Sequence, residues 1–363
     1  MSRTVQVAEP RVGVLGFGYW GPNLVRNFAE QNALAAVCEQ DPSRRKKAQS
    51  QYPHIQIFAD YDDMLKSGQI DAVAIATPVE FHYTHAKAAL QADKHVLVEK
   101  PLARTTRECL DLITTAKGRD RRLMAGHTFL YNAAVRKIQQ MLHAGELGDL
   151  LYIYAQRLNL GIIRQDINAM WNLAPHDIAI IHHLTQKNPL RVSARGLTYL
   201  RHNLPDVVFM LLEFPNNIAA HIHISWLDPQ KMRRMTIVGS DKMVVYDDVS
   251  ADAKLQVYDK GVSKVSEDKG KQAPSSFGEF QLLIRSGDLL VPNIHFEEPL
   301  RGECAHFLEC IKTGRRPLSD GWDGLRVVSV LEAADQSLGQ GGIPVDINPS
   351  IFRNAPPIAS ETT

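Results

Sequence analysis

Continuous apolar runs recur along the first third of the chain, separated by polar segments long enough for crossover helices. Such runs, without alternation, are typical of parallel strands that are covered by helices on both faces of a sheet. Six runs fit this description, at 12–15, 34–38, 55–58, 72–76, 95–98 and 123–125. They predict a doubly wound α/β domain over residues 11–128.

The pattern changes from about residue 150, where strand-like stretches follow one another at short spacing: 151–158, 190–199, 207–214, 218–226, 235–238 and 243–246. Several alternate apolar and polar positions, as 220–224 (AHIHI) does, which is typical of an antiparallel sheet with one wetter face. We expect a further strand between loops within 250–276, two closing helices, and a loosely held tail from Asn348. These features predict two domains, 1–128 and 129–363.

Length and charge narrow the possible partners. The 363 residues suffice for roughly two to three domains, and a net charge of +1 offers no basic excess for nucleic acid. Four scattered cysteines without CxxC pairing argue against a disulfide scaffold and favour a reducing compartment. No apolar run approaches a membrane span, and the N-terminus lacks a signal-peptide core. We therefore expect a soluble, cytoplasmic protein with neither nucleic-acid nor membrane partners.

A glycine turn follows the first predicted strand directly. Gly16 permits a tight turn, Gly18 lets the backbone approach a pyrophosphate, and Gly21 lets the next helix pack close to the strand. The free N–H groups of that helix then face the phosphates. The turn predicts a dinucleotide site formed by Gly16, Phe17, Gly18, Tyr19, Trp20 and Gly21. The alternative is a glycine turn without a ligand.

An acid at the end of the second predicted strand bears on the choice of cofactor. Glu39 lies about 20 residues after the turn, where a ribose diol is usually held, while Asp41 is expected to cap the following helix. An acid there repels a 2′-phosphate and so favours NAD over NADP. Arg44 and Arg45 leave the choice open, because they are placed to bind a 2′-phosphate or to form a solvated helix face.

Four motifs together resemble the glucose-fructose oxidoreductase and inositol dehydrogenase (Gfo/Idh/MocA) family, and in particular its branch of nucleotide-sugar 3-dehydrogenases. They are GFGYWG at 16–21, ATP at 76–78 with His82 beyond it, EKP at 99–101 and WNLAPHD at 171–177. The resemblance implies an N-terminal Rossmann domain and a C-terminal α+β domain with a large, mostly antiparallel open sheet. It also implies homodimers or homotetramers formed through that sheet.

The same resemblance implies that Lys100 and His176 lie beside the nicotinamide. Alcohol oxidation needs a base for the hydroxyl proton, and imidazole titrates near neutral pH. We expect His176 to accept the proton and Lys100 to orient the oxygen, with the reverse assignment open. Without the family, Lys100 extending to solvent and His176 capping a helix are the simpler interpretations. The family commonly has an acid where this chain has Asn172, an amide that cannot relay a proton but can orient a sugar hydroxyl.

The remaining candidates divide between cofactor and substrate. Thr77, Pro78, His82 and Glu99 are expected beside the cofactor. Arg157, Asn159 and Arg164 are expected to bind the substrate, since arginine forks suit a diphosphate. Neither the His82/His85 pair nor the His221/His223 pair is completed by a Cys or carboxylate cluster, so we expect no metal.

These residues and the resemblance predict NAD-dependent oxidation of the C3 hydroxyl of a UDP-linked N-acetylhexosamine. The 3-keto product would pass to a PLP-dependent aminotransferase. The alternatives are a dehydrogenase of another nucleotide sugar or of a free polyol or inositol, and a non-catalytic NAD-sensing regulator.

Overall fold

The computed structural model describes residues 9–161, 167–200, 204–262, 284–285 and 287–359. The chain forms two compact units. The first consists of Met1–Tyr131, Glu297–Glu332 and Asn354–Thr363, and the second of Asn132–Phe296 and Ala333–Arg353. The chain first crosses between units close to the predicted boundary at 128. The predicted domain 129–363 needs correction, however, because the chain returns to the first unit at residue 297.

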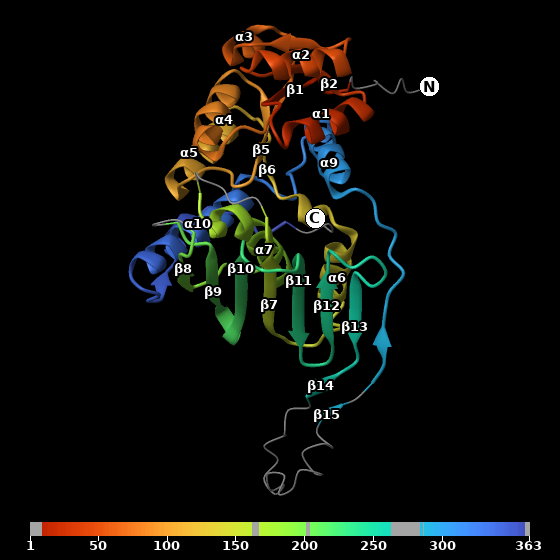
Figure 1. Ribbon diagram of the computed structural model, residues 1–363, viewed down its shortest axis with the longest axis vertical. Helices are drawn as coiled ribbons and strands as arrows, with labels where there is room; N and C mark the ends of the chain where they lie inside the picture. Colours follow the sequence, from red (N-terminus) through yellow and green to blue (C-terminus); the bar gives the residue numbers. More distant parts are fainter. Residues whose placement is uncertain (1–8, 162–166, 201–203, 263–283, 286, 360–363) are drawn as a thin grey trace, which may run out of the picture. The chain divides into compact units, whose positions relative to one another are not determined.

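The first unit contains a parallel six-stranded sheet in the order β3-β2-β1-β4-β5-β6. Its strands are β1 (Val12–Leu15), β2 (Leu34–Cys38), β3 (Gln56–Phe58), β4 (Ala72–Ile75), β5 (His95–Glu99) and β6 (Leu123–Gly126). In Figure 1, α4 and α5 lie on one side of this sheet and α1 and α9 on the other. Such cover explains why the strands are continuously apolar. The predicted doubly wound Rossmann domain is confirmed.

Three of the crossover helices begin at side chains that satisfy their first backbone N–H groups. Asp41 caps α2, Asp60 caps α3, and Thr105 with Glu108 forms a capping box on α5. The cap role predicted for Asp41 is therefore confirmed. The helices are α1 (Gly21–Glu30), α2 (Pro42–Gln51), α3 (Tyr61–Lys66), α4 (His82–Gln91) and α5 (Thr106–Gly118).

Helix α9 (Pro299–Thr313) belongs to the first unit because its apolar side is buried there. Leu300, Phe307 and Leu308 are buried, and the Phe307 ring meets Phe28 of α1 edge-on with 6.5 Å between centroids. Each such side chain stabilises the fold by about 1.5–3 kcal/mol. The return of the chain to this unit thus has a hydrophobic cause.

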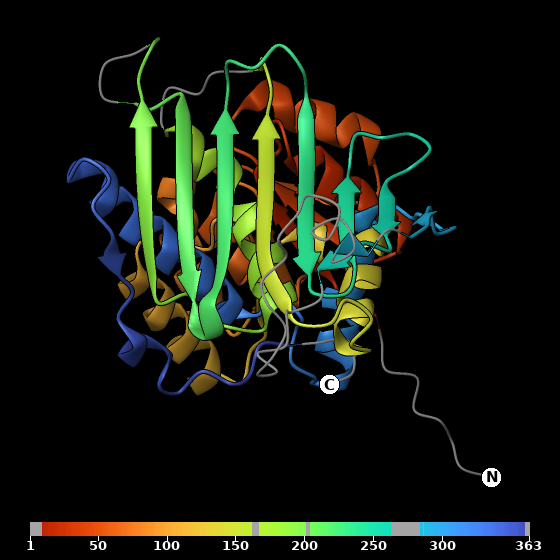
Figure 2. The ribbon, with the colours of Figure 1, turned by 90° about the horizontal axis from the view of Figure 1, so that it is seen from below.

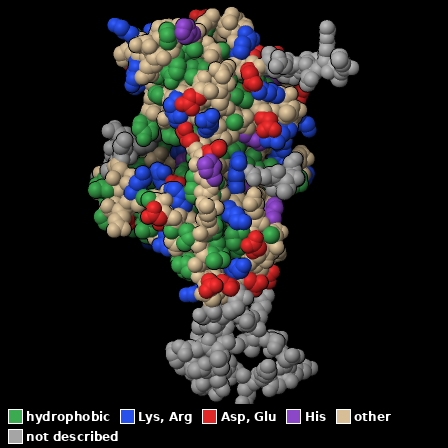
Figure 3. Space-filling model, turned by 90° about the vertical axis from the view of Figure 1, so that its right-hand side faces the viewer, with side chains coloured by type: hydrophobic (Ala, Val, Ile, Leu, Met, Phe, Trp, Pro, Cys, Tyr) green, Lys and Arg blue, Asp and Glu red, His purple; other side chains and the backbone are tan. Residues whose placement is uncertain are grey.

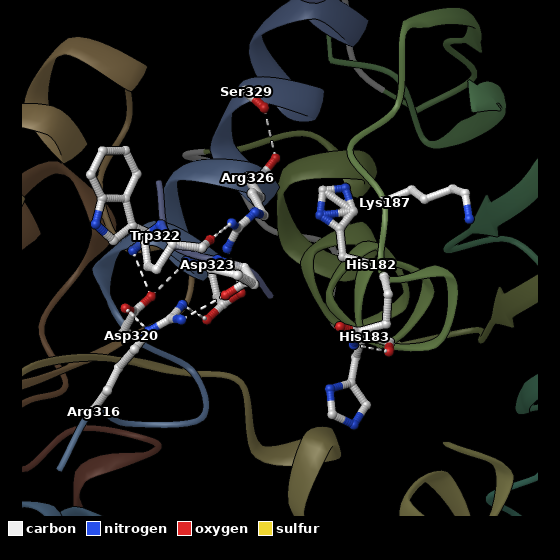
Figure 4. A network of polar contacts seen from close by, with 12 residues as sticks. His182, His183, Lys187, Arg316, Asp320, Trp322, Asp323, Arg326 and Ser329 are labelled. Atoms are coloured by element: carbon white, nitrogen blue, oxygen red, sulfur yellow. Dashed lines mark hydrogen bonds and ion pairs between the residues drawn. The ribbon is translucent and has the colours of Figure 1, made fainter. Parts of the chain in front are cut away.

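Two arginines anchor the chain's final described residues to the first unit, close to helix α10 (Gly321–Gly339). Arg326, only 2% exposed, donates to Asp323 Oδ1 at 2.9 Å and to the Pro356 carbonyl at 2.8 Å. Arg316 donates to the Pro357 carbonyl at 2.6 Å. Figure 4 shows the guanidinium groups of Arg316 and Arg326 directed toward the carboxylates of Asp320 and Asp323. The expectation of a loosely held tail is therefore wrong for residues 356–357.

The second unit contains a nine-stranded sheet in the order β16-β13-β12-β11-β7-β10-β9-β8-β17. The β7–β10 pair is parallel and the other described pairs are antiparallel. The strands are β7 (Leu150–Leu158), β8 (Arg191–Leu197), β9 (Val207–Phe214), β10 (Ile218–Ser225), β11 (Met232–Gly239), β12 (Met243–Asp247), β13 (Leu255–Tyr258), β16 (Leu289–Leu290) and β17 (Val345–Asp346). The predicted mostly antiparallel sheet is confirmed. A separate pair joins β14 (Gly261–Val262) to β15 (Ile284–Arg285).

Helices α6 (Ala133–His143) and α7 (Ala169–Thr185) belong to this unit, and α7 packs against β7, β9 and β10. The opposite face of the sheet, turned to the viewer in Figure 2, carries no helix among the described residues. Side chains on this open face alternate with buried ones. Phe209 and Leu211 of β9 are exposed, and the rings of Phe209 and His223 stack at 4.4 Å.

Candidate functional site

The glycine turn (16–21) has the geometry that a pyrophosphate requires. Gly16 has φ +94°, and a Cβ on Gly21 would lie 1.9 Å from the Gly16 carbonyl oxygen, so neither position accepts a side chain without strain. A Cβ on Gly18 would meet only the Arg44 guanidinium, at 3.5 Å. The backbone at Gly18 is therefore open to a ligand, as the sequence predicts.

Helix α1 begins at this turn with its N-terminus uncapped. Trp20 occupies the N-cap position without a side-chain cap, and the first turn contains no acidic residue. Free N–H groups and the positive end of the helix dipole suit an anionic group. The turn thus fits a dinucleotide pyrophosphate. Phe17 is buried, whereas Tyr19 is 89% exposed.

Glu39 lies beside the glycine turn at the carboxyl end of β2. It accepts hydrogen bonds from the N–H of Phe17 at 2.7 Å and of Asp41 at 3.0 Å, which hold the carboxylate in place. The Arg44 guanidinium is 3.9 Å away and largely exposed. Arg45 instead donates to the backbone carbonyl of Glu39. The structure therefore leaves only Arg44, of the two arginines, beside the predicted ribose position.

Thr77, Pro78 and His82 follow β4, the strand beside β1. The sheet's strand order reverses between these two strands, which is where open α/β sheets bind ligands. Both ring nitrogens of His82 contact backbone carbonyl oxygens, of Pro101 at 2.8 Å and of Thr77 at 2.9 Å. Burial lowers the pKa of His82. His82 thus links the ends of β4 and β5, and its contact with the cofactor stays a prediction.

Glu99 and Lys100 lie at the end of β5, followed by a cis Lys100–Pro101 peptide. The carboxylate of Glu99 accepts a hydrogen bond from the Trp20 indole and one from the Lys100 N–H at 3.3 Å. Burial raises the pKa of Glu99 to about 7, against the opposing effect of the Lys100 ammonium. Glu99 therefore holds the glycine turn rather than presenting a free carboxylate.

His176 and Asn172 belong to the second unit, on α7. Asn168 caps the helix by accepting from the Trp171 N–H at 2.9 Å. Asn172 and His176 are four residues apart and so lie on one face of the helix, where both are half-buried. The amide and the imidazole thus project from the same face of α7.

Arg157, a predicted substrate residue, forms a buried ion pair within the second unit. Its guanidinium donates to both carboxylate oxygens of Asp177, at 2.7 and 2.9 Å, and both residues are buried. The fork that would bind a diphosphate is thus occupied, and the pair joins β7 to α7 beside His176. Asn159 follows β7 and is half-buried, while Arg164 lies outside the described residues.

The sequence analysis missed two buried residues that interact electrostatically with Glu99 or Lys100. Glu303 of α9 is fully buried; it accepts from the Thr128 hydroxyl at 2.8 Å, and its Oε1 has no hydrogen-bond partner. His127, directly after β6, is also buried, with no hydrogen bond to either ring nitrogen. In the sequence, Glu303 could have been noticed as an acidic residue within the apolar stripe formed by Leu300, Cys304 and Phe307.

The described residues contain no group of three or more His, Cys, Asp or Glu placed to hold a metal ion. None of their helices is long and apolar enough to cross a membrane. Acidic and basic side chains are interspersed on the face shown in Figure 3.

Two family models match most of the chain. The model described as "Oxidoreductase family, NAD-binding Rossmann fold" matches residues 10–127, and that of the GFO/IDH/MocA C-terminal domain matches residues 135–245. The chain belongs to the GFO/IDH/MocA family. The predicted family is therefore confirmed, and with it an oxidoreductase with an NAD-binding type of Rossmann domain.

Individual GFO/IDH/MocA relatives differ in how much of the chain they match. A UDP-N-acetylglucosamine 3-dehydrogenase of Acidithiobacillus ferrooxidans is 27% identical over 88% of this chain and 94% of its own length. A crystal form of that enzyme, GnnA, aligns with a TM-score of 0.78 at 26% identity, covering 92% of this chain and 99% of its own. An inositol 2-dehydrogenase of Corynebacterium glutamicum is 22% identical over 93% of this chain and 97% of its own length.

A further GFO/IDH/MocA relative matches only in part. This is a 1-carboxy-3-chloro-3,4-dihydroxycyclo hexa-1,5-diene dehydrogenase of Comamonas testosteroni, 26% identical over 59% of this chain. The chain spans 57% of the length of that relative. Relatives of this family thus act on different alcohols.

Proposed function

We propose that this GFO/IDH/MocA protein is an NAD-dependent dehydrogenase that oxidises the C3 hydroxyl of a UDP-linked N-acetylhexosamine to the 3-keto sugar. The observation that carries the redox part is the glycine turn: an open Gly18, an uncapped α1 and the carboxylate of Glu39 beside them. The substrate rests on the similarity to a UDP-N-acetylglucosamine 3-dehydrogenase over 88% of the chain.

In the proposed mechanism the bound oxidised nicotinamide supplies the hydride acceptor. His176 takes the hydroxyl proton, and Lys100 donates a hydrogen bond to the same oxygen, orienting it and stabilising its developing negative charge. The reverse assignment uses the same two residues. Asn172, one turn before His176, holds a sugar hydroxyl by hydrogen bonding, since its amide carries no charge.

The assay for this proposal follows NADH absorbance when the pure protein is mixed with NAD and UDP-N-acetylglucosamine. We expect steady NADH formation with the UDP-sugar and none with free N-acetylglucosamine. If no sugar in a panel of UDP- and dTDP-sugars leads to NADH formation, the proposal of a nucleotide-sugar substrate is rejected. Because Arg157 is occupied by Asp177, the chain has fewer described cations for a diphosphate than expected. The second candidate is therefore a dehydrogenase of free polyols, and inositols belong in the same panel.

The geometry of Glu39 leads us to propose NAD rather than NADP. In Glu39→Gln, one charge is lost while an acceptor for the Phe17 N–H remains. We expect the dissociation constant for NAD to rise roughly 10- to 100-fold, as a charged hydrogen bond to the ribose is weakened, and that for NADP to fall. Fluorescence titration with both cofactors measures the change in preference.

Asp41→Asn is the matched control, because asparagine caps a helix as well as aspartate does. This variant should keep the original preference, as Asp41 bonds the α2 N-terminus. If Glu39→Gln keeps the preference for NAD as well, the carboxylate does not face the ribose.

We also propose that the open face of the large sheet joins subunits into a homodimer or homotetramer. Exposed Tyr152, Phe209 and Leu211 on that face support this.

Four cysteines without disulfides support a cytoplasmic location. A 3-keto sugar is a carbonyl substrate that a PLP-dependent aminotransferase can convert to an amine, which makes such an enzyme the proposed next step.

A further inference from the structure

We propose that Glu99 is a positioning residue that ties the glycine turn to the Lys100 turn, and that its ionisation is linked to binding of the oxidised cofactor. The two turns come from distant parts of the chain, after β1 and after β5. The Glu99 carboxylate contacts both of them, through the Trp20 indole and the Lys100 N–H. A change of charge at Glu99 therefore acts at once on the cofactor turn and on the residue expected to orient the substrate.

The surroundings of Glu99 leave room for its carboxyl and little else. A Cβ on Gly126, on neighbouring β6, would lie 3.0 Å from the Glu99 Cα and 3.1 Å from its Oε2. A side chain at residue 126 would therefore displace the carboxyl from Trp20 and Lys100. The lack of a side chain at Gly126 therefore keeps this space for the carboxyl.

Two carboxyls share this region, the half-buried Glu99 and the fully buried Glu303. Burial raises the pKa of Glu99 only to about 7, since Lys100 and Trp20 stabilise its anion. Burial and the Glu99 anion together raise the pKa of Glu303 well above its usual range. Burial thus favours the neutral form of both carboxyls, and Glu99 is the one that contacts Trp20 and Lys100. Other titratable groups of the described residues that interact electrostatically with Glu99 or Lys100 include His82 of α4, His127 after β6 and Cys304 of α9.

The link to the cofactor follows from charge. This step rests on the proposed function, in which an oxidised nicotinamide lies beside Lys100. A second cation there stabilises the Glu99 anion and lowers its pKa on binding. The complex then holds fewer protons than the free protein, so affinity for NAD⁺ must rise as the pH rises through the pKa of the free protein. NADH has an uncharged nicotinamide and should show little of this dependence.

The first test needs no cofactor and no substrate. Trp20 donates to Glu99, so its fluorescence should report the ionisation of that carboxyl as a transition centred near the pKa of about 7. We expect the transition to vanish in Glu99→Gln and in Trp20→Phe, and to persist in Glu303→Gln. This last variant is the matched control, since it replaces the neighbouring buried acid by the same neutral amide.

Opposite behaviour of the two glutamates, with the transition lost in Glu303→Gln and kept in Glu99→Gln, would overturn the assignment. A wild-type protein without any transition linked to Trp20 would do the same. Far-UV circular dichroism establishes that each variant is folded. Because this measurement involves only the free protein, its result does not depend on the proposed dehydrogenase function.

The second test compares cofactor affinities between about pH 6 and about pH 8. We expect the dissociation constant for NAD⁺ to fall roughly three- to tenfold with rising pH, that for NADH to change less, and both to be flat in Glu99→Gln. If Trp20 fluorescence shows the transition but the dissociation constant for NAD⁺ does not change with pH, the link between Glu99 ionisation and cofactor binding is rejected. The contact of Glu99 with both turns would still stand. Failure to bind either cofactor would reject the proposed function itself.

Discussion

Lys100→Met is expected to lower kcat/KM by about 10²- to 10⁴-fold, while the protein still binds the cofactor. Methionine has a similar length but can neither donate a hydrogen bond nor carry charge. The loss should therefore appear in turnover, because the substrate oxygen loses the group that orients it and stabilises its charge. Steady-state NADH formation and a separate NAD titration measure the two effects.

Lys117→Met is the control for this substitution. Lys117 is an exposed lysine in the last turn of α5, and its loss should leave turnover within about twofold, since surface substitutions usually change little. Unchanged turnover in Lys100→Met would remove Lys100 from the chemistry. A protein that binds NAD but turns over no substrate before or after the change would fit the NAD-sensing regulator instead.

Arg157→Met is expected to reduce the free energy of unfolding by about 3–5 kcal/mol, because it leaves the Asp177 carboxylate buried without its partner. The double variant Arg157→Met/Asp177→Leu should lose much less, since an apolar pair needs no compensating charge. Urea denaturation of the single and double variants measures the coupling between the two residues. The pair joins β7 to α7, so the single variant should also displace His176 and reduce turnover.

Arg191→Met provides the comparison on the surface. Arg191 donates to Asp346 at 2.9 Å, but both side chains are exposed, and such pairs contribute about 0–1 kcal/mol. If Arg157→Met instead unfolds like the wild type and loses affinity only for the UDP-sugar, Arg157 binds substrate as the sequence first suggested.

Local pattern was a reliable guide to the fold. The apolar runs located the six strands of the first sheet, and β1 and β2 match their predicted bounds at both ends. The alternation in 220–224 predicted the half-exposed strand β10, because side chains in a strand point to opposite faces in turn. The glycine turn was found from its spacing and from the predicted strand before it, since its geometry depends on residues within a few positions of each other.

The sequence did not reveal which partners within the protein some candidate residues have. The side chains of His82 and Arg157 have the chemistry of ligand contacts, yet His82 binds two backbone carbonyls and Arg157 binds Asp177. Glu303 and Glu99 are more than 200 residues apart, and only the packing of α9 within the first unit brings them close enough for their charges to interact.

The sequence by itself determined the fold class, the family, the dinucleotide turn and the acid beside it, because these depend on short periods and short spacings. Only the tertiary structure decided that 297–332 returns to the first unit, that Arg157 is occupied, and that Glu99 contacts two turns at once. The physical reason is burial. The pKa of a carboxyl and the availability of a guanidinium depend on which groups exclude water from them. These groups cannot be identified from the neighbouring sequence.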